Sequence, residues 1–370
     1  MTPRVAVNLL WCVPGEVGGS EQYLVRQLAG LSARAGAPEA TLLCLESFAR
    51  AHPDLVARHP TATAPIDGLS RGRRILAEHG WLTRRSSGFD LVHHGGGTTP
   101  LAGPRPIVLT VHDLQYLTFP RYAAPLKLRY LRAVVPRSVE RSTVVTVPTD
   151  YVRRTVVDRF DIDADDVVVV PHGVGSELGR AAPGADELRS RHGLGDGPVL
   201  VLPAITHPHK GHVFLLEVVA RSWTDPDLRL VLLGGAGSAD DEVTAAIERL
   251  GLAGRVVRLG RVDDAERDGL IALADALVFP SEYEGFGAPI VEAMALGTPV
   301  ICSDQPALAE VASDAAIVLP LDADAWSGAI DRLEREAPAL RQAGLRRARD
   351  FTTEASGAAL EAAYRRALGR

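Results

Sequence analysis

The stretch Ser281–Val300 reads SEYEGFGAPIVEAMALGTPV, and the expected fold of the whole chain is built outward from it. The apolar run just before it, 276–280, predicts a buried strand. A loop with two glycines follows, and Pro289 suits the first position of a helix, where its missing N–H has no helical partner. Gly297 and Pro299 end that helix, and a second apolar strand begins directly after them. The stretch therefore predicts strand, glycine loop, helix and strand, the repeating unit of a parallel sheet.

This arrangement turns free backbone N–H groups and the positive end of a helix dipole toward the loop, which makes a ready phosphate site. Two carboxylates flank it, Glu284 on the loop and Glu292 in the expected first turn of the helix. A carboxylate is a poor ligand for phosphate but a good acceptor for sugar hydroxyls. The pattern predicts a nucleotide-sugar site. The alternative is an ordinary strand–helix crossover with surface glutamates.

The complete string, EGFG followed by EAMA and G-PV, resembles the signature of the retaining glycosyltransferases of the GT4 type. The resemblance implies the α/β fold called GT-B, with two facing Rossmann-like domains, parallel sheets and an interdomain cleft. It implies that Glu284 lies beside the donor sugar and that Glu292 binds the ribose. It also assigns donor binding to neighbouring residues, namely Gly285, Phe286, Gly287, Ala288 and Val262.

Length, composition and charge narrow the class of protein. The chain has 370 residues, enough for two domains, with 46% hydrophobic and 23% charged residues. A formal net charge of −6 argues against a nucleic-acid partner. The odd number of cysteines, 3, without paired spacing, predicts reduced thiols in a cytoplasmic protein. No apolar run is long enough to span a membrane, and the start of the chain lacks the features of a signal peptide.

The N-terminal half alternates short apolar runs with helical stretches, which predicts a parallel sheet. We expect residues 1–175 to form a Rossmann-like domain on the acceptor side. Gly18 and Gly19 open the first helix, where they would allow a ligand to approach closely, or serve only the geometry of the turn. They also match the glycine loop that faces the donor phosphates in GT4 enzymes. The strands expected here are 5–10, 41–45, 89–92, 107–111, 144–147 and 167–170.

Histidines follow two of these strands. His112 and Asp113 come after 107–111, and the end of a strand is where open α/β sheets place ligand contacts. The pair resembles the TxHD segment of the family, whose histidine lies near the reacting sugar; the alternative is a histidine that bonds a loop carbonyl. His93 and His94 end an earlier strand, and we expect them to cap it rather than to face a cleft.

Residues 121–141 carry six arginine or lysine side chains between apolar ones, which predicts a basic amphipathic helix or helix pair. Such a helix could lie on the anionic inner face of a membrane. The alternative is a charged face that contacts only solvent.

A second alternation of apolar strands and helical stretches begins after a charged linker. We expect residues 176–351 to form the nucleotide-sugar-binding domain. Its expected strands are 198–203, 228–233, 256–259, 276–279 and 300–301. The resemblance implies that the last helix, 352–370, packs back on the N-terminal domain.

Lys210 follows the first strand of this second half and can hold a phosphate as a point charge. In GT4 enzymes an arginine shortly before this lysine helps to neutralise the leaving diphosphate, but here Ala204 and Ile205 occupy those positions. Lys210 therefore acts alone or with a residue from elsewhere, for which Arg261 is the first candidate.

We expect no metal and no other cofactor. His207, His209 and His212 cluster around Lys210, but their spacing matches no strong zinc pattern. Asp161-Ile162-Asp163 has the Asp-x-Asp form of metal-dependent transferases, yet it reads as a polar surface loop.

The predicted reaction is transfer of a hexosyl group from a nucleoside diphosphate sugar to a hydroxyl of a sugar, lipid-linked or small-molecule acceptor, with retention. Lys210, Glu284 and His112 are the expected catalytic residues. The segments HDLQYLTFP and PHKGH resemble bacterial mannosyltransferase-like members and favour GDP-mannose. Alternatives are a GT-B nucleotide-sugar epimerase, a non-catalytic sugar-binding module, and a dinucleotide-dependent oxidoreductase, for which the spacing of Gly15, Gly18 and Gly19 is wrong.

Overall fold

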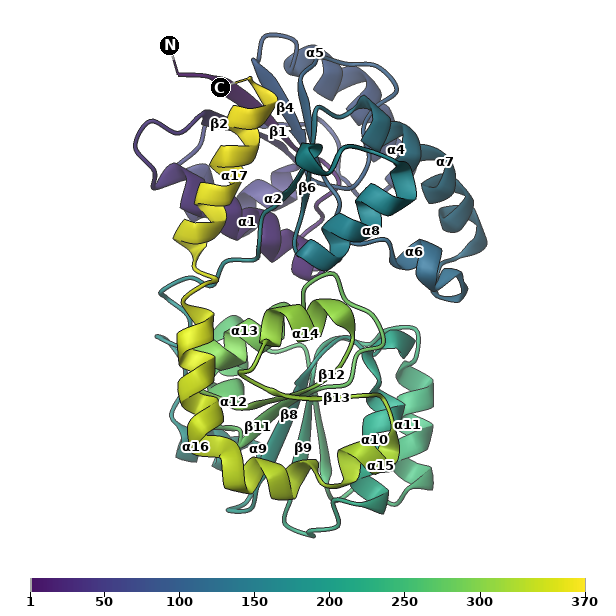
Figure 1. Ribbon diagram of the computed structural model, residues 1–370, viewed down its shortest axis with the longest axis vertical. Helices are drawn as coiled ribbons and strands as arrows, with labels where there is room; N and C mark the ends of the chain where they lie inside the picture. The colour runs from purple at the N-terminus through teal and green to yellow at the C-terminus, as the bar shows by residue number, and fades with distance from the viewer. Residues whose placement is uncertain (1, 370) are drawn as a thin grey trace. The chain divides into compact units, whose positions relative to one another are not determined.

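Two parallel sheets organise the chain, one of seven strands and one of six (Figure 1). The structure is a computed structural model, and it describes residues 2–369. The chain divides into an N-terminal unit, which runs up to Gly173 and resumes at Phe351, and a C-terminal unit, Val174–Asp350. The sequence prediction had placed the divisions after residues 175 and 351.

The N-terminal unit is built on a sheet with the strand order β3-β2-β1-β4-β5-β6-β7. All pairs are parallel; Val5 of β1 lies opposite Ala40 of β2 on one side and Leu91 of β4 on the other. The central strands are apolar and buried, as expected for a parallel sheet covered on both faces. The strands are β1 (Arg4–Leu9), β2 (Glu39–Cys44), β3 (Thr61–Thr63), β4 (Leu91–His94), β5 (Ile107–Thr110), β6 (Val144–Val147) and β7 (Val167–Val169).

The last helix of the chain packs beside the first one (Figure 1). Two glycines allow this close approach: a Cβ on Gly30 would lie 2.0 Å from the carbonyl oxygen of Thr353, and one on Gly357 would lie 2.2 Å from the backbone of Gly30. The predicted return of the C-terminal helix to this unit is therefore seen in the packing of α17 on α1. The helices are α1 (Gly19–Ser32), α2 (Glu46–Ala51), α3 (Pro53–Val56), α4 (Arg71–Ala77), α5 (Thr83–Arg85), α6 (Gln115–Thr118), α7 (Pro125–Arg141), α8 (Asp150–Phe160) and α17 (Thr353–Ala367), with a π-helical turn at Glu78–Leu82.

The C-terminal unit repeats the same plan with the strand order β10-β9-β8-β11-β12-β13. Its strands are also parallel, and the central ones are buried, with Leu277 of β11 opposite Val201 of β8 and Val300 of β12. The strands are β8 (Val199–Pro203), β9 (Arg229–Leu233), β10 (Val256–Gly260), β11 (Ala276–Phe279), β12 (Val300–Ser303) and β13 (Ile317–Leu319).

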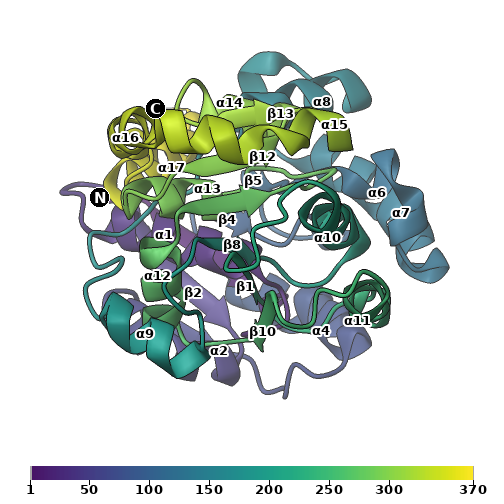
Figure 2. The same ribbon diagram turned by 90° about the horizontal axis from the view of Figure 1, so that it is seen from below.

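Helices cover both faces of this second sheet. In Figure 2, α9, α12 and α16 lie on one side of it and α10 and α11 on the other. The helices are α9 (Ala185–His192), α10 (His212–Arg221), α11 (Asp240–Arg249), α12 (Asp264–Leu273), α13 (Ala288–Ala295), α14 (Pro306–Ala312), α15 (Ala323–Ser327) and α16 (Ala329–Ala348). Among residues 2–369, no helix is both long enough and apolar enough to cross a membrane.

Two sheets with the order of a doubly wound fold confirm the predicted α/β architecture of Rossmann-like domains. Three features differ from the prediction. The edge strands β3 and β13 were not foreseen, and neither were the short helices of residues 46–85. The strand expected at 89–92 lies two residues later, at Leu91–His94, so both histidines belong to the strand. Cys12, Cys44 and Cys302 are buried free thiols, as predicted.

Candidate active site

In each unit, the point at which the strand order of the sheet reverses locates the expected ligand site. Ligands of open α/β sheets bind beyond the carboxyl ends of the two strands at that point. In the C-terminal unit these neighbours are β8 and β11, which lead to Lys210 and to the 281–287 loop. In the N-terminal unit they are β1 and β4, which lead to the Gly18–Gly19 turn and to the glycines after His94.

The loop after β11 has the predicted form. Gly287 takes the left-handed conformation, with φ +88°, immediately before Ala288 begins α13. A Cβ on Gly287 would also lie 2.4 Å from Leu308, so no other residue fits this turn without displacement. Phe286 is buried, whereas Ala288 is half-buried at the first turn of the helix. The backbone N–H groups of this turn have no partners within the helix, which suits them to an anion.

Lys210 and Glu284 are brought together as an ion pair. Lys210 Nζ donates to Glu284 Oε1 at 2.5 Å, and both side chains are mostly buried, with exposed fractions of 19% and 13%. The ammonium also lies 5.6 Å from the centre of the Phe279 ring. Gln305 Nε2 donates to the carbonyl of Glu284 at 3.3 Å, which ties the loop to the start of α14. The two predicted catalytic groups of this unit therefore hold one another in place.

Glu292 differs from its prediction. It is the fifth residue of α13 rather than a first-turn residue, and only 6% of its surface is exposed. Its carboxylate lies near Arg267: burial lowers the pKa of that guanidinium, but the charges of Glu292, Asp264 and Asp268 outweigh it and raise the pKa. Glu292 is thus a buried, charge-compensated carboxylate in the second turn of α13, and the expected first-turn position was wrong.

A cavity of about 390 Å³ lies at the carboxyl ends of β8, β9 and β10, and sequence reasoning missed it. Its polar wall is a network in which Asp240 accepts from Arg258 at 2.5 Å and from Thr206 Oγ1 at 2.8 Å. Val262 lies just beyond it, half-buried in the turn that follows β10. The volume is within the range of small-molecule sites. The sequence feature that could have indicated this cavity is Gly234 at the end of β9, because that glycine lies in the turn that lines the cavity.

The glycine turn of the N-terminal unit is open, as the prediction required. Gly18 has φ +60° and Gly19 begins α1, and no atom lies within 4 Å of where a Cβ would stand on either. Glu21, which the sequence did not single out, supports this turn: its Oε2 accepts from the N–H of Gly15 at 3.0 Å. His52 Nε2 lies 2.7 Å from the other carboxylate oxygen.

His112 lies directly after β5, and its ring has one defined tautomer. Nε2 lies 2.8 Å from the carbonyl oxygen of Gly95, which can only accept, so Nε2 carries the proton. Burial lowers the pKa of His112 to about 4, partly offset by that hydrogen bond. The ring is therefore neutral near pH 7, and Nδ1, which makes no hydrogen bond within residues 2–369, is an acceptor.

His93 and His94 are buried in β4 and do not cap an exposed strand end. His93 bridges Tyr364 Oη and Thr110 Oγ1, each at 2.8 Å, and so fixes α17 on the sheet. These contacts assign a structural role to His93.

The residues that were considered as metal ligands lie in surroundings that do not form a metal site. His207 and His209 stack with their ring centres 5.8 Å apart, and His212 is the buried first residue of α10. Asp161 and Asp163 are exposed between α8 and β7, as the surface-loop prediction stated. Within the described part of the chain, no group of three or more histidine, cysteine, aspartate or glutamate side chains is arranged to hold a metal ion.

Comparison with known proteins places this site in a family. Residues 17–178 match the model of Glycosyltransferase Family 4, and residues 185–350 match that of Glycosyl transferases group 1. The chain is 30% identical to the O-antigen chain mannosyltransferase B of Escherichia coli over 274 residues, which are 72% of this chain and 71% of that protein. The chain belongs to the GT4-type glycosyltransferases. It is also 30% identical to the MMP alpha-(1->4)-mannosyltransferase of Mycolicibacterium hassiacum over 323 residues, 81% of this chain and 74% of that one.

A solved structure extends the likeness of this GT4 enzyme to its whole fold. The crystal structure of Anabaena Alr3699/HepE in complex with UDP and glucose superposes with a TM-score of 0.76 at 20% identity, covering 97% of this chain and 98% of that one. The fold is thus GT-B, and the predicted family and enzyme class, a glycosyltransferase, are confirmed.

Proposed function

We propose that this GT4 enzyme moves a hexosyl group from a nucleoside diphosphate sugar to an acceptor hydroxyl, with retention at the anomeric carbon. The observation that carries the proposal is the Lys210–Glu284 ion pair beside the start of α13. It puts a cation, a helix N-terminus and a hydroxyl-binding carboxylate in one loop cluster. A diphosphate attached to a sugar presents the matching groups, two anionic phosphates followed by hydroxyls.

Lys210 and the backbone amides of Gly287 and Ala288 would stabilise the diphosphate as it leaves. The bond between the anomeric carbon and the phosphate oxygen breaks with its electron pair on that oxygen, while a bond to the acceptor oxygen forms and the acceptor loses its proton. Charge therefore grows on the diphosphate, where preorganised donors act most strongly. Glu284 would orient the donor sugar and Glu292 would bind ribose.

His112 would accept a hydrogen bond from a sugar hydroxyl. Its proton on Nε2 is committed to Gly95, and its lowered pKa keeps the ring neutral. Nδ1 is then the nitrogen that can contact substrate. A neutral acceptor of this kind suits positioning of a hydroxyl better than proton donation at pH 7.

We infer that the hexosyl group is mannosyl and that the donor is GDP-mannose, which the names of the two similar mannosyltransferases support. The Anabaena protein of the same fold was crystallised with UDP and glucose, so a UDP-sugar is the second donor to test. The acceptor is a hydroxyl of a sugar, a lipid-linked glycan or a small molecule. No metal is required, because Lys210 and the α13 amides supply the positive charge.

We also propose that α7 brings the enzyme to an anionic membrane surface. Lys127, Arg129, Arg132 and Arg137 are exposed along this helix, and Glu140 is its single acidic residue. Leu126 at its start is 82% exposed. Basic side chains beside an exposed leucine are the composition of a helix that lies on a membrane.

The test is a thermal-shift panel of GDP-, UDP-, ADP- and dTDP-sugars, each with and without EDTA, followed by turnover of the best donor. We expect one nucleotide family to raise Tm, EDTA to have no effect, and the α-linked donor to yield an α-linked product. Stabilisation by none of the donors would contradict the proposed site. Conversion of the donor sugar to its epimer without any acceptor would show an epimerase instead.

A further inference from the structure

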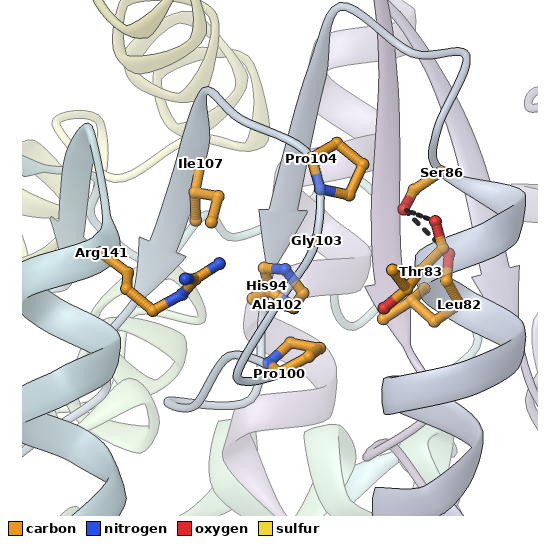
Figure 3. A pocket seen from close by; sticks show the side chains of 10 residues that line it. All are labelled: Leu82, Thr83, Ser86, His94, Pro100, Ala102, Gly103, Pro104, Ile107 and Arg141. Atoms are coloured by element: carbon orange, nitrogen blue, oxygen red, sulfur yellow. Dashed lines mark hydrogen bonds between the residues drawn. The ribbon is translucent and has the colours of Figure 1, made fainter.

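A second, much smaller cavity lies within the N-terminal unit (Figure 3). It holds about 10 Å³, room for a single water-sized particle. Its walls come from the π-helical turn and α5, from the 100–104 loop, and from β4, β5 and α7. The lining includes four polar side chains. Thr83 and Ser86 donate their hydroxyl hydrogens to the carbonyls of Glu78 and Leu82, whereas His94 from β4 and Arg141 from the last turn of α7 carry N–H groups that these carbonyls do not engage.

The contacts of Asn8 determine which nitrogen of His94 carries the proton. Asn8 Oδ1 accepts from the N–H of Leu10 at 3.1 Å, so the other side of its amide is the NH₂ group. That group donates to Glu78 Oε1 at 3.0 Å and contacts His94 Nδ1 at 3.2 Å. His94 Nδ1 is therefore an acceptor, and its Nε2 bears the hydrogen.

His94 Nε2 makes no hydrogen bond within residues 2–369, and it is not sealed among protein atoms. His94 is only 4% exposed and lines the cavity. Its Nε2–H donor therefore faces the cavity rather than bulk solvent. Burial, followed by the nearby charge of Arg141, lowers the pKa of His94 to about 3. The ring is accordingly a neutral donor at this point.

Arg141 supplies positive charge without a compensating carboxylate. Its guanidinium extends from α7 toward His94 (Figure 3). Within the described residues it makes no ion pair and no side-chain hydrogen bond, and its Nε is fully buried without a partner. Arg141 as a whole is half-buried, and a charge that is partly removed from water gains from a counter-ion. Glu78, the carboxyl of this network, lies on the far side of Asn8, and burial, offset in part by Asn8, raises its pKa.

We propose that this cavity is a binding site for a small inorganic anion of the size of chloride. The anion would accept from His94 Nε2 and from the Arg141 guanidinium, and it would neutralise the charge that the protein leaves unpaired. Its volume of about 10 Å³ favours a monatomic ion over phosphate or a carboxylate group. A water molecule would satisfy the two donors, but it would not supply the missing charge. The site is separate from the proposed sugar-transfer chemistry and does not depend on it.

The first test uses bromide as the probe in crystals of the whole protein. We expect an anomalous peak at the cavity within hydrogen-bond reach of His94 Nε2 and the Arg141 guanidinium. Bromide at other surface positions with only water in this cavity would overturn the proposal. The wild-type protein is used, so folding of a variant plays no part in the result.

The second test is thermal unfolding in sodium chloride against sodium gluconate at equal ionic strength. Chloride well above its dissociation constant should raise Tm by about 2–4 °C, whereas gluconate is too large to enter. Arg141→Gln should abolish this difference. Arg137→Gln, an exposed arginine one turn earlier on α7, is the matched control and should retain it. An equal response of both variants, or none in the wild type, would contradict the site.

Discussion

Lys210 and Glu284 are partners in one ion pair, so a change at either residue alters the surroundings of the other. Lys210→Ala removes the cation that we propose to face the leaving diphosphate, and it leaves Glu284, 13% exposed, without its 2.5 Å contact. The sequence predicted both residues as site groups. It could not predict their pairing, because one follows β8 and the other β11, and only the sheet order makes those strands neighbours.

We expect Lys210→Ala to lower kcat about 10²–10³-fold, the range for loss of one oxyanion donor, while donor affinity falls less. Lys210→Arg should restore only part of the rate, because a planar fork replaces a point charge. Single-turnover kinetics and donor titration on the same variants separate the two effects. A near wild-type rate in the alanine variant would mean that another cation, with Arg261 the first candidate, neutralises the diphosphate.

Glu292→Gln should weaken donor binding by about 1–3 kcal/mol, the cost of a lost charged hydrogen bond. Because Glu292 is buried near Arg267, we also expect a modest loss in the free energy of unfolding, which a solvent-facing residue would not show. Calorimetry and urea unfolding measure the two. Glu242→Gln, an exposed glutamate at the start of α11, is the control and should change neither. Unchanged donor affinity would exclude Glu292 from the ribose site.

The burial of Glu292 could not be read from the sequence. The apolar residues around it predict one buried face of α13, and the glutamate falls outside that face. In the structure Glu292 lies near Arg267 of α12. This contact joins residues far apart in the chain, so no local pattern announces it.

At the scale of elements, long apolar strands were predictable and short edge strands were not. The core strands β1, β6 and β11 carry runs of buried valine and leucine, which dominate the local pattern. The edge strands β3 and β13 have three residues each and are only partly buried, so their alternation is too brief to recognise. The basic character of α7 was predicted, and of the two alternatives, one helix or a helix pair, the structure has one helix that continues through Pro136.

We expect the enzyme to sediment with anionic liposomes and to be released by salt, because exposed charges on α7 are screened at high ionic strength. Replacing Lys127, Arg129 and Arg132 by glutamine should reduce this binding strongly. A matched triple change of exposed arginines on α16 and at its C-terminal end, Arg335, Arg346 and Arg349, should not. Equal sedimentation with neutral and anionic vesicles would instead identify α7 as a face that contacts only solvent.

At the scale of the molecule, several histidines are buried in the N-terminal unit in their neutral form. Burial above all lowers the pKa of His93 and of His94 to about 3 and that of His112 to about 4. The unfolded chain, with a histidine pKa near 6.5, binds more protons below that pH than the folded one does. The stability that these groups contribute is complete above pH ~6.5 and is lost as the pH falls toward 3–4.

We therefore expect the free energy of unfolding to fall by about 1–2 kcal/mol per buried histidine between pH 7 and pH 5, measured by urea titration. Glu78, whose pKa is raised chiefly by burial, acts with the opposite sign and reduces the total. His93→Gln should reduce the difference, while His79→Gln, an exposed histidine, should leave it unchanged. Equal stability at the two pH values would show that these rings are not held neutral.

The repeated α/β pattern was enough to predict two Rossmann-like folds, because each half carries its own buried strands and helical crossovers. The glycine turns and Lys210 were predictable for the same reason, since each follows a recognisable strand. The 390 Å³ cavity was not, because Thr206, Asp240 and Arg258 come from separate elements and meet only in the folded sheet.

The most direct measurement is calorimetry on the wild type and on Lys210→Ala, without any acceptor. Each protein is titrated with the preferred nucleoside diphosphate and with the corresponding unphosphorylated nucleoside, and the affinities are compared. If Lys210 holds the diphosphate, the variant should lose about 10–100-fold in diphosphate affinity, or about 1.4–2.8 kcal/mol, while nucleoside affinity stays the same. An equal preference for the diphosphate in both proteins would contradict the assignment of Lys210 and, with it, the proposed donor site.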